Sequence, residues 1–394
     1  MVTAAEPGNY EALLNAVQST LPSRGLTHNF YKYPARFSPE FARTAIDTFS
    51  NTGDVVLDPF MGSGTTLVEA FAAGRHAIGG DISSLAHFIA KTKTTLLSPE
   101  ALEAVLSWAD RIEQKINIRQ TASPSGIWAE AGYQKYLPWQ LRKSIELLLD
   151  AIKTFPTIEQ ENFARAALLK TAQWAIDCTT AFPTALEFRR RFVASLNELA
   201  VGLSELREAV AKLESGSPSI LCFNTPASNL HPKLWQGAIK KKPSLVVTSP
   251  PYPNVHVLYH RWQVGGRKET PAPFWIAGQL DGNGESFYTM GSRSPTGERR
   301  YFASIEESFS RVHGLLAPSA KVVQLIAFSN IEMQLPKYLL AMKSSGFQEM
   351  ELGINDGEGE TRVWRHVPLR RWYATLKGNT SSSRELLLIH RRLD

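Results

Sequence analysis

The 394-residue chain is poor in cysteine and has no long apolar run. Its two cysteines, Cys178 and Cys222, are far apart and lack the spacing of metal ligands, so the sequence predicts neither a disulfide framework nor a metal site. A membrane-spanning helix needs about 18 consecutive apolar residues, and none occur. The first ten residues also lack the basic-then-apolar pattern of a signal peptide. These absences predict a cytoplasmic protein with no membrane partner.

Positive charge is unevenly distributed along the chain. Residues 1–100 contain seven Lys/Arg and nine Asp/Glu, whereas residues 240–300 contain nine and four, and residues 361–394 contain eight and two. The formal net charge is +6. A surface that binds phosphate would therefore be expected in the C-terminal half.

Short runs of apolar and β-branched residues predict strands at 54–58, 76–81, 219–223, 244–248, 321–328 and 385–390. The first run is followed by a glycine-rich turn, a helix predicted over 65–73, and the second strand. This β-α-β opening predicts an α/β fold with a mostly parallel, Rossmann-like sheet. The stretch 253–300 has few periodic apolar residues, and we expect long loops there, over the carboxyl edge of the sheet.

Residues 98–217 differ from the rest because their apolar residues recur at helical spacing. Ser98-Pro99 is a typical helix start. From Phe192 to Leu213 the apolar residues alternate steps of four and three, which indicates a long helix packed against neighbours. The sequence therefore predicts a core in two parts, 1–97 and 218–394, interrupted by an all-helical insertion over 98–217.

The first chemical motif is Asp58-Pro-Phe-Met-Gly62-Ser-Gly64-Thr-Thr66, between a predicted strand and a predicted helix. Glycines permit a tight turn, and the helix N-terminus offers free N–H groups to a polar ligand. No Gly-Lys-Ser/Thr follows, which disfavours a phosphate-binding P-loop. Asp81 ends the next strand, where a carboxylate can accept both hydroxyls of a ribose.

The second motif is Ser249-Pro250-Pro251-Tyr252, directly after the strand 244–248. Two prolines make the turn rigid and leave their carbonyls without internal partners. The turn then presents a hydroxyl, a carbonyl and an aromatic face. This set suits a planar heterocycle with an amino group, which would stack on Tyr252 while its amino hydrogens reach the oxygens of Ser249 and Pro250.

Together the two motifs resemble those of the amino-methylating DNA methyltransferases, the N4-cytosine and N6-adenine enzymes. The segment His28–Pro39 resembles the part of that family that precedes the cofactor motif and helps to hold the methionine end of the cofactor. The resemblance covers about 28–95 and 220–390. It implies a class I methyltransferase core that binds S-adenosyl-L-methionine, and it implies these cofactor-binding residues: Tyr33, Pro34, Ala35, Phe37, Asp58, Pro59, Phe60, Gly62, Gly64, Thr65, Thr66, Asp81 and Ile82.

The same resemblance implies that Ser249, Pro250, Pro251 and Tyr252 are the catalytic residues. The target base must leave the duplex to reach them, which costs a few kcal/mol. The serine form of the motif favours cytosine N4. The alternatives are adenine N6, then an amino group of RNA, then a catalytically silent DNA-binding subunit. Neither cysteine follows a proline, which argues against methylation of cytosine carbon 5, a reaction that needs a thiolate.

The family usually has an acidic residue after the strand that corresponds to 219–223, in contact with the adenine ring. Asn224 stands there, so no such contact is assigned. The target-recognition region is expected either in the helical insertion or in 253–300. Basic and aromatic residues after the catalytic motif predict contacts with double-stranded DNA: His256, His260, Arg261, Trp262, Arg267 and Lys268. A restriction endonuclease or another defence-system component is a candidate partner.

Overall fold

In this computed structural model the described residues are 3–4, 10–19, 25–33, 37–123, 126–214, 216–253, 261–266, 268–282, 290, 294–351, 362–366 and 384–394. The strands are β1 (Thr3–Ala4), β2 (Val55–Asp58), β3 (His76–Asp81), β4 (Ile220–Asn224), β5 (Leu245–Thr248), β6 (Trp262–Val264), β7 (Lys268–Thr270), β8 (Lys321–Ile326), β9 (Phe347–Glu351), β10 (Val363–His366) and β11 (Arg384–Arg392). The α-helices are α1 (Glu11–Gln18), α2 (Pro39–Phe49), α3 (Thr65–Ala72), α4 (Ser84–Thr94), α5 (Pro99–Lys115), α6 (Ile127–Glu130), α7 (Trp139–Ile152), α8 (Ile158–Ile176), α9 (Ala185–Ala211), α10 (Ala272–Ala277), α11 (Pro295–Leu315) and α12 (Ile331–Ser344). Short 3-10 helices are η1 (Leu26–Phe30), η2 (Ala227–Asn229) and η3 (Pro232–Leu234).

The main sheet has the order β1-β9-β11-β8-β5-β2-β3-β4, and β10 pairs with β11. Strands β8, β5, β2, β3 and β4 are mutually parallel, whereas β11 is antiparallel to β8 and β9. Chain order reverses between β2 and β5, so the loops after these strands diverge at their carboxyl ends, where open α/β sheets bind ligands. The predicted Rossmann-like α/β fold is confirmed, and the strands predicted from sequence are all present.

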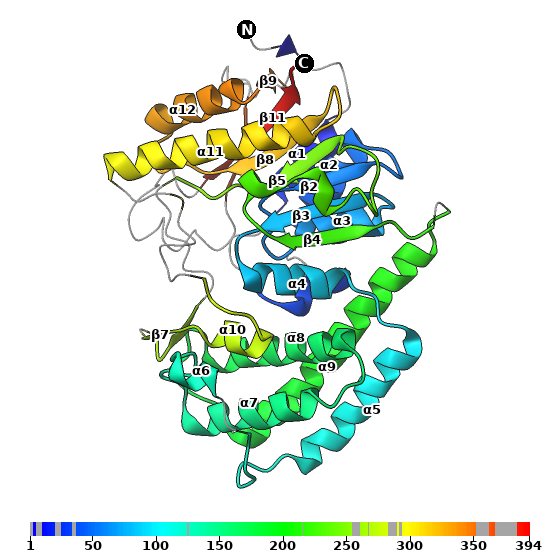
Figure 1. Cartoon of the computed structure of the whole chain (residues 1–394), viewed down its shortest axis with the longest axis vertical. Coiled ribbons are helices and arrows are strands. Elements are labelled where there is room, and N and C mark those ends of the chain that lie inside the picture. The colour runs from blue at the N-terminus through cyan, green and yellow to red at the C-terminus, as the bar shows by residue number, and fades with distance from the viewer. Residues whose placement is uncertain are drawn as a thin grey trace.

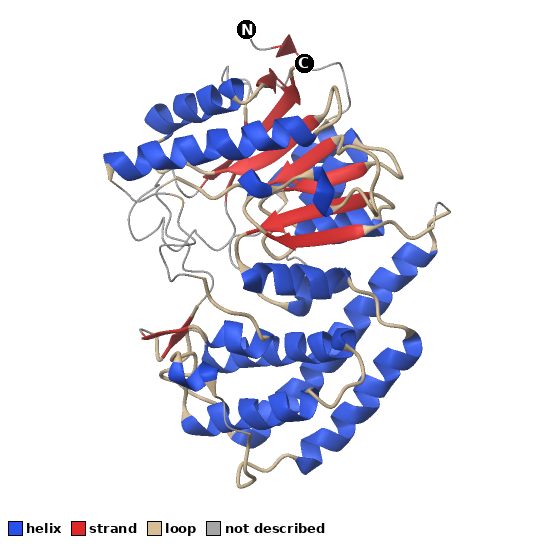
Figure 2. Cartoon of the chain, in the orientation of Figure 1, coloured by secondary structure: helices blue, strands red, loops and turns tan. Residues whose placement is uncertain are grey.

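Helices cover both faces of the sheet (Figures 1 and 2). Because successive strand residues point to opposite faces, Val55 and Leu57 pack with α11 and α12, while Val56 packs with α1, α2 and α3. Both faces are therefore buried, which is why the parallel strands read as nearly continuous apolar runs.

Helices α5 to α9 form a helical block that occupies the lower half of Figure 1. Its apolar side chains make one cluster with those of α4 and η1, so the block is continuous with the core and not tethered to it by a linker. Helix α9 lies against η1 at Gly202, where a β-carbon would stand 2.0 Å from the carbonyl oxygen of Leu26. Only glycine permits this approach.

The expectation of long loops over 253–300 needs correction. The described part of this stretch contains a hairpin of β6 and β7, helix α10, and the start of α11 at Pro295. Gly265 and Gly266, both with positive φ, form the hairpin turn. Helix α11 begins at Ser294-Pro295, with the Ser294 hydroxyl accepting the Gly297 N–H at 3.1 Å. Strands β6 and β7 and helix α10 are short, and the buried apolar residues of α11 lie beyond residue 300, so apolar periodicity within 253–300 did not predict these elements.

Candidate active site

The glycine-rich turn and the Ser-Pro-Pro-Tyr turn lie at the carboxyl ends of adjacent parallel strands, β2 and β5. Their link is a buried hydrogen bond of 2.7 Å from the Thr248 hydroxyl to the Asp58 carboxyl, which also accepts the Phe60 N–H at 3.2 Å. Burial raises the pKa of Asp58 to about 7, against the lowering effect of these bonds. Asp58 thus holds the two motifs in register.

Beyond Asp58, the turn leads directly into α3. Gly64 caps the helix in the left-handed conformation, with φ of 79°, and no side chain occupies the cap position. Pro59, Thr65 and Thr66 are buried, and the Thr66 hydroxyl donates to the Val247 carbonyl at 3.1 Å. The first N–H groups of α3 therefore face the turn without a side-chain cap, as a polar ligand would require.

Asp81, at the end of β3, faces the same turn. One carboxyl oxygen accepts the Gly62 N–H at 2.9 Å and the other accepts the Ser83 N–H at 2.8 Å. Burial raises the pKa of Asp81 to about 6. An ionised carboxyl has roughly four acceptor positions, so each oxygen retains one for a further donor.

Asn224 shows why an acidic residue would not fit at the end of β4. Its side-chain amide donates to the backbone carbonyls of Asp81 and Ile82, both at 3.0 Å. A carboxylate in this place would face two carbonyl oxygens and repel them. The asparagine at this position therefore has a local structural reason.

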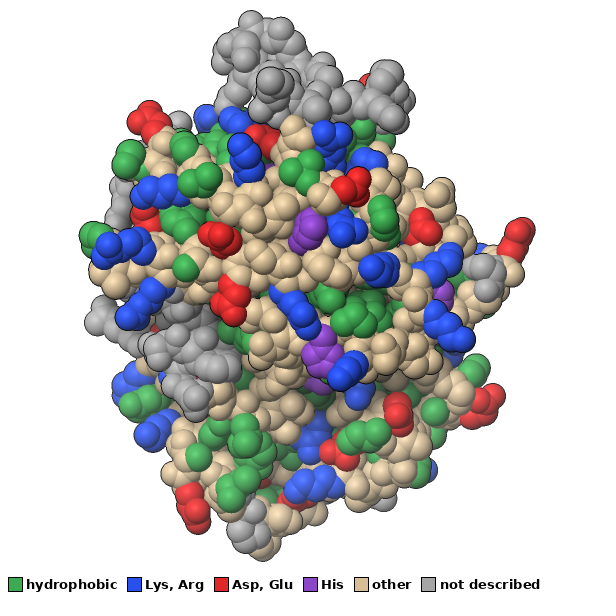
Figure 3. All heavy atoms as spheres, turned by 45° about the horizontal axis from the view of Figure 1, so that its top comes forward, with side chains coloured by type: hydrophobic (Ala, Val, Ile, Leu, Met, Phe, Trp, Pro, Cys, Tyr) green, Lys and Arg blue, Asp and Glu red, His purple; other side chains and the backbone are tan. Residues whose placement is uncertain are grey.

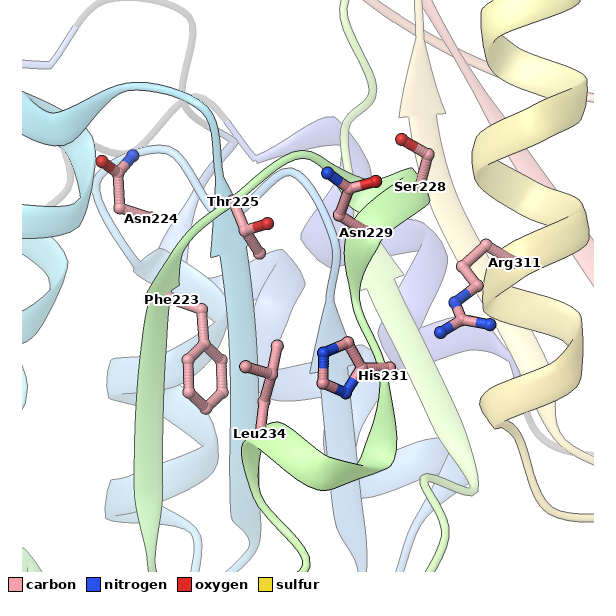
Figure 4. A pocket seen from close by; sticks show the side chains of 8 residues that line it. All are labelled: Phe223, Asn224, Thr225, Ser228, Asn229, His231, Leu234 and Arg311. Carbon is pink, nitrogen blue, oxygen red and sulfur yellow. The ribbon is translucent and has the colours of Figure 1, made fainter.

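A cavity of about 590 Å³ opens beside β4 and next to Asn224 (Figure 4). The ring of Phe223, the Leu234 side chain and the imidazole of His231 lie side by side in it, and Arg311 reaches toward it from α11. Nothing in the sequence pattern indicated this cavity.

The Ser-Pro-Pro-Tyr turn is fixed by bonds from several elements. The Ser249 hydroxyl donates to the Leu325 carbonyl of β8 at 2.9 Å, and its oxygen lies 3.3 Å from the Tyr252 hydroxyl. The Tyr252 hydroxyl donates to Glu385 of β11. Pro250 is buried, and the Pro251 carbonyl accepts the Tyr301 hydroxyl at 2.8 Å.

Sequence reasoning missed the residues behind this turn. Glu385 is paired with Arg365 of β10 at 2.6 Å, and both side chains are buried. Burial raises the pKa of Tyr301 well above its usual value, so this hydroxyl stays a donor. Glu385 is 133 residues from Tyr252 in the chain, and only the sheet brings them together.

The segment before the cofactor turn is described in part. Phe37 is buried against Phe41, and Pro34 and Ala35 lie outside the described residues. The Tyr33 ring would be 3.4 Å from a β-carbon on Gly62. Helix α8 holds this segment, because the Gln173 amide accepts the Lys32 N–H at 3.2 Å and donates to the Lys32 carbonyl at 2.9 Å.

Of the residues expected to contact DNA, His256, His260 and Arg267 lie outside the described residues. Lys268 is exposed, and Arg261 forms an ion pair with Asp281 at 2.8 Å. The expectation for Trp262 needs correction. Its side chain is buried, and its indole N–H donates to the Tyr31 hydroxyl at 2.9 Å, so it is a core residue.

Two further properties concern metals and membranes. Within the described ranges, no three His, Cys, Asp or Glu side chains gather into a group that could hold a metal ion. In the same part of the chain, every helix is too short or too polar to cross a bilayer.

Residues 10–92 match the profile of the N6/N4-type DNA methylase family, whose description reads DNA methylase. Over 157 residues the chain is 28% identical to the type II methyltransferase M.MvaI of Kocuria varians, covering 38% of this chain and 35% of that protein. It is 34% identical over 98 residues to the type II methyltransferase M.BsoBI of Geobacillus stearothermophilus, covering 23% and 19%.

A third relative is the DNA adenine methyltransferase YhdJ of Escherichia coli K12, which is 35% identical over 79 residues and covers 20% of this chain and 27% of that protein. The chain thus spans about a third or less of the length of these relatives. The matched family region contains the β2–α3 turn and Asp81. Over residues 10–92, this chain is similar to the DNA methylases.

Proposed function

We propose that this protein is an S-adenosylmethionine-dependent DNA methyltransferase that acts on an exocyclic amino group, with cytosine N4 as the favoured target. The observation that carries the proposal is the Asp58–Thr248 bond, which joins the glycine-rich turn to the Ser-Pro-Pro-Tyr turn at one edge of the sheet. A methyl donor and a methyl acceptor must meet at a single place, and adjacent strand ends provide it.

The residues around β2 and β3 fit the cofactor. Asp81 keeps one acceptor position on each oxygen, the number that the two ribose hydroxyls need. The uncapped first turn of α3 offers backbone N–H groups to the polar methionine end. Bound S-adenosylmethionine supplies an electrophilic methyl group on a sulfonium.

Ser249 is suited to orient the target amine. Its hydroxyl hydrogen is directed to the Leu325 carbonyl, so the lone pairs of its oxygen are free to accept an amino hydrogen. The Pro250 carbonyl is the second acceptor. Together they turn the nitrogen lone pair toward the methyl group and stabilise the positive charge that grows on nitrogen. Tyr252, fixed through Glu385, supplies the stacking surface for the flipped base.

Adenine N6 is the second candidate, because adenine and cytosine present the same amino group beside a ring nitrogen. The similarity to YhdJ, described as a DNA adenine methyltransferase, favours it. Serine at position 249 favours cytosine, since the resemblance associates that form of the motif with N4 enzymes.

Mass spectrometry of nucleosides from the DNA of cells that express the protein tests this proposal. We expect N4-methylcytosine with the intact chain and none with Ser249→Ala. Ser107→Ala, on the exposed face of α5, is the matched control and should behave as the intact chain. Detection of N6-methyladenine instead would show that the target is adenine N6, the second candidate. If the protein is expressed and folded and the DNA contains no modified base, the proposal is wrong.

A further inference from the structure

The two regions that could recognise a target, the helical block and the segment after the catalytic turn, form one structural unit. Tyr133 of the block connects them. Its hydroxyl accepts the Asp281 N–H at 2.8 Å, and its carbonyl accepts the Thr270 hydroxyl at 3.4 Å. Tyr133 is buried and its ring packs edge-on against Trp128 at 5.0 Å. The β6–β7 hairpin is therefore anchored on the block.

Three exposed residues closely follow Tyr133 in the sequence, and together with exposed Lys268 we call them the aromatic tip: Lys135, Tyr136, Trp139 and Lys268. The side chains of Tyr136 and Trp139 are 54% and 59% exposed. The Lys268 ammonium lies 5.2 Å from the centre of the Tyr136 ring, so the two regions also meet at the surface. Large aromatic side chains at this exposure leave apolar area in water that a partner would bury.

Tyr136 carries a second unusual feature. Its φ is +64°, in the left-handed region that side chains other than glycine and asparagine rarely adopt. Residues held in such a conformation destabilise the fold and cluster at functional sites, including those that clamp a ligand. The fold thus holds this ring outward at some cost to stability.

Basic side chains near the tip favour a polyanionic partner. Residues 131–143 contain Lys135, Arg142 and Lys143 and no acidic residue, and of these Arg142 is paired with Glu146 at 3.8 Å. In Figure 1, α6 and β7 lie on the side toward which the parallel strands point, and the first turns of α11 lie on that side too. These turns carry exposed Arg299 and Arg300. That side is the left of Figure 3, where Lys and Arg side chains lie along the margin above and below the centre of the face.

We propose that the aromatic tip is a docking surface for the DNA duplex, in which Lys135 and Lys268 contact phosphates and Tyr136 and Trp139 pack against bases or sugars. The inference rests on the proposed function and specifies where the substrate is held. Cations that contact phosphates supply most of the affinity of a protein for duplex DNA, and exposed aromatic rings add contacts to sugars or to unstacked bases. The β6–β7 hairpin begins at Trp262, ten residues after Tyr252, so Lys268 of the tip is close in sequence to the Ser-Pro-Pro-Tyr turn.

Binding of a fluorescein-labelled DNA duplex of mixed sequence, followed by anisotropy over a salt series, tests the docking surface. We expect Tyr136→Ala and Trp139→Ala each to weaken binding about ten-fold, the size of one lost stacking contact. In the double variant Lys135→Ala/Lys268→Ala, the plot of the logarithm of the DNA association constant against the logarithm of the salt concentration should also become less steep. We expect the magnitude of its slope to fall by about two, one for each phosphate contact.

Two controls separate this surface from others on the block. Trp174→Ala removes a similarly exposed tryptophan of α8, and Lys212→Ala removes an exposed lysine after α9; neither should change binding. Binding of S-adenosylmethionine, measured by calorimetry, should be unchanged in every variant. If the intact chain methylates DNA and the tip variants bind DNA normally, the docking surface is wrong and the proposed function stands. If the intact chain neither binds nor methylates DNA, both are wrong.

Discussion

Asp58 and Thr248 lie on different strands, yet one hydrogen bond between them aligns the two turns on which the proposed chemistry depends. The carboxyl of Asp58 is almost fully buried, which disfavours its charged form. Asp81 is affected in the same direction. At the scale of single residues, the site therefore holds two carboxyls whose ionisation opposes folding near neutral pH.

This gives a pH dependence with a definite sign. The pKa of Asp58 is about 7 in the folded protein and about 3.9 in an unfolded chain. Between these values the folded state retains a proton that the unfolded state has lost, so the free energy of unfolding falls as pH rises. Asp58→Asn cannot ionise, and we expect a flatter dependence between pH 4 and pH 7 in urea unfolding.

Asp150→Asn is the control for that measurement. Partial burial raises the pKa of Asp150, but bonds from Ser123 and Lys153 outweigh it and hold the pKa below its usual value. Its stabilising effect is complete above the unfolded pKa and is lost only in more acidic solution. The variant should therefore keep the wild-type slope from pH 4 to pH 7. An unchanged slope in Asp58→Asn would contradict the assignment.

At the scale of elements, three helices start in the same way. Ser38, Ser98 and Ser294 each precede a proline, and each hydroxyl accepts the N–H three residues on. The Ser-Pro pattern predicted α5 but applies equally to α11, where the neighbouring sequence had indicated loops. Helix positions, in contrast, depend on close contacts such as the one at Gly202 of α9, which no local signal marks.

Gly202→Ala should destabilise the protein by about 1–3 kcal/mol, since the new β-carbon would force α9 and η1 apart. Gly314→Ala is a matched control inside α11, where a β-carbon meets nothing within 4 Å. It should stabilise by about 0.5–1 kcal/mol because glycine is a poor helix former. Thermal unfolding compares the two. Equal effects would show that helix propensity, and not the contact with η1, decides the outcome.

For the whole molecule, the shared cluster of the helical block, α4 and η1 links the insertion to the cofactor side of the sheet. Gln173 is the most direct connection, because its amide satisfies both backbone groups of Lys32, next to Tyr33. The block therefore supports the segment that the resemblance places at the methionine end of the cofactor. Its division from the core at 98 and 217 remains a prediction.

Gln173→Ala should weaken cofactor binding, because two partly buried backbone groups of Lys32 would lose their partner at a cost of about 1 kcal/mol. Gln173→Glu keeps the acceptor and loses the donor, so we expect an intermediate effect. Calorimetry with S-adenosylmethionine measures it, with thermal unfolding alongside. Wild-type affinity in Gln173→Ala would show that the block does not support this segment.

The sequence by itself determined the parallel sheet, the two motifs and the helical character of 98–217, because apolar periodicity, glycine-rich turns and Ser-Pro caps act over a few residues. It also determined that Asp58 ends a strand and that Ser249 directly follows one. It could not determine that these strands are neighbours, that Tyr252 is held by Glu385, or that Trp262 is buried against Tyr31. Those relations join residues more than a hundred positions apart. Strand order and helix packing decide them, since burial and pairing energies depend on the whole assembled core and not on any local segment.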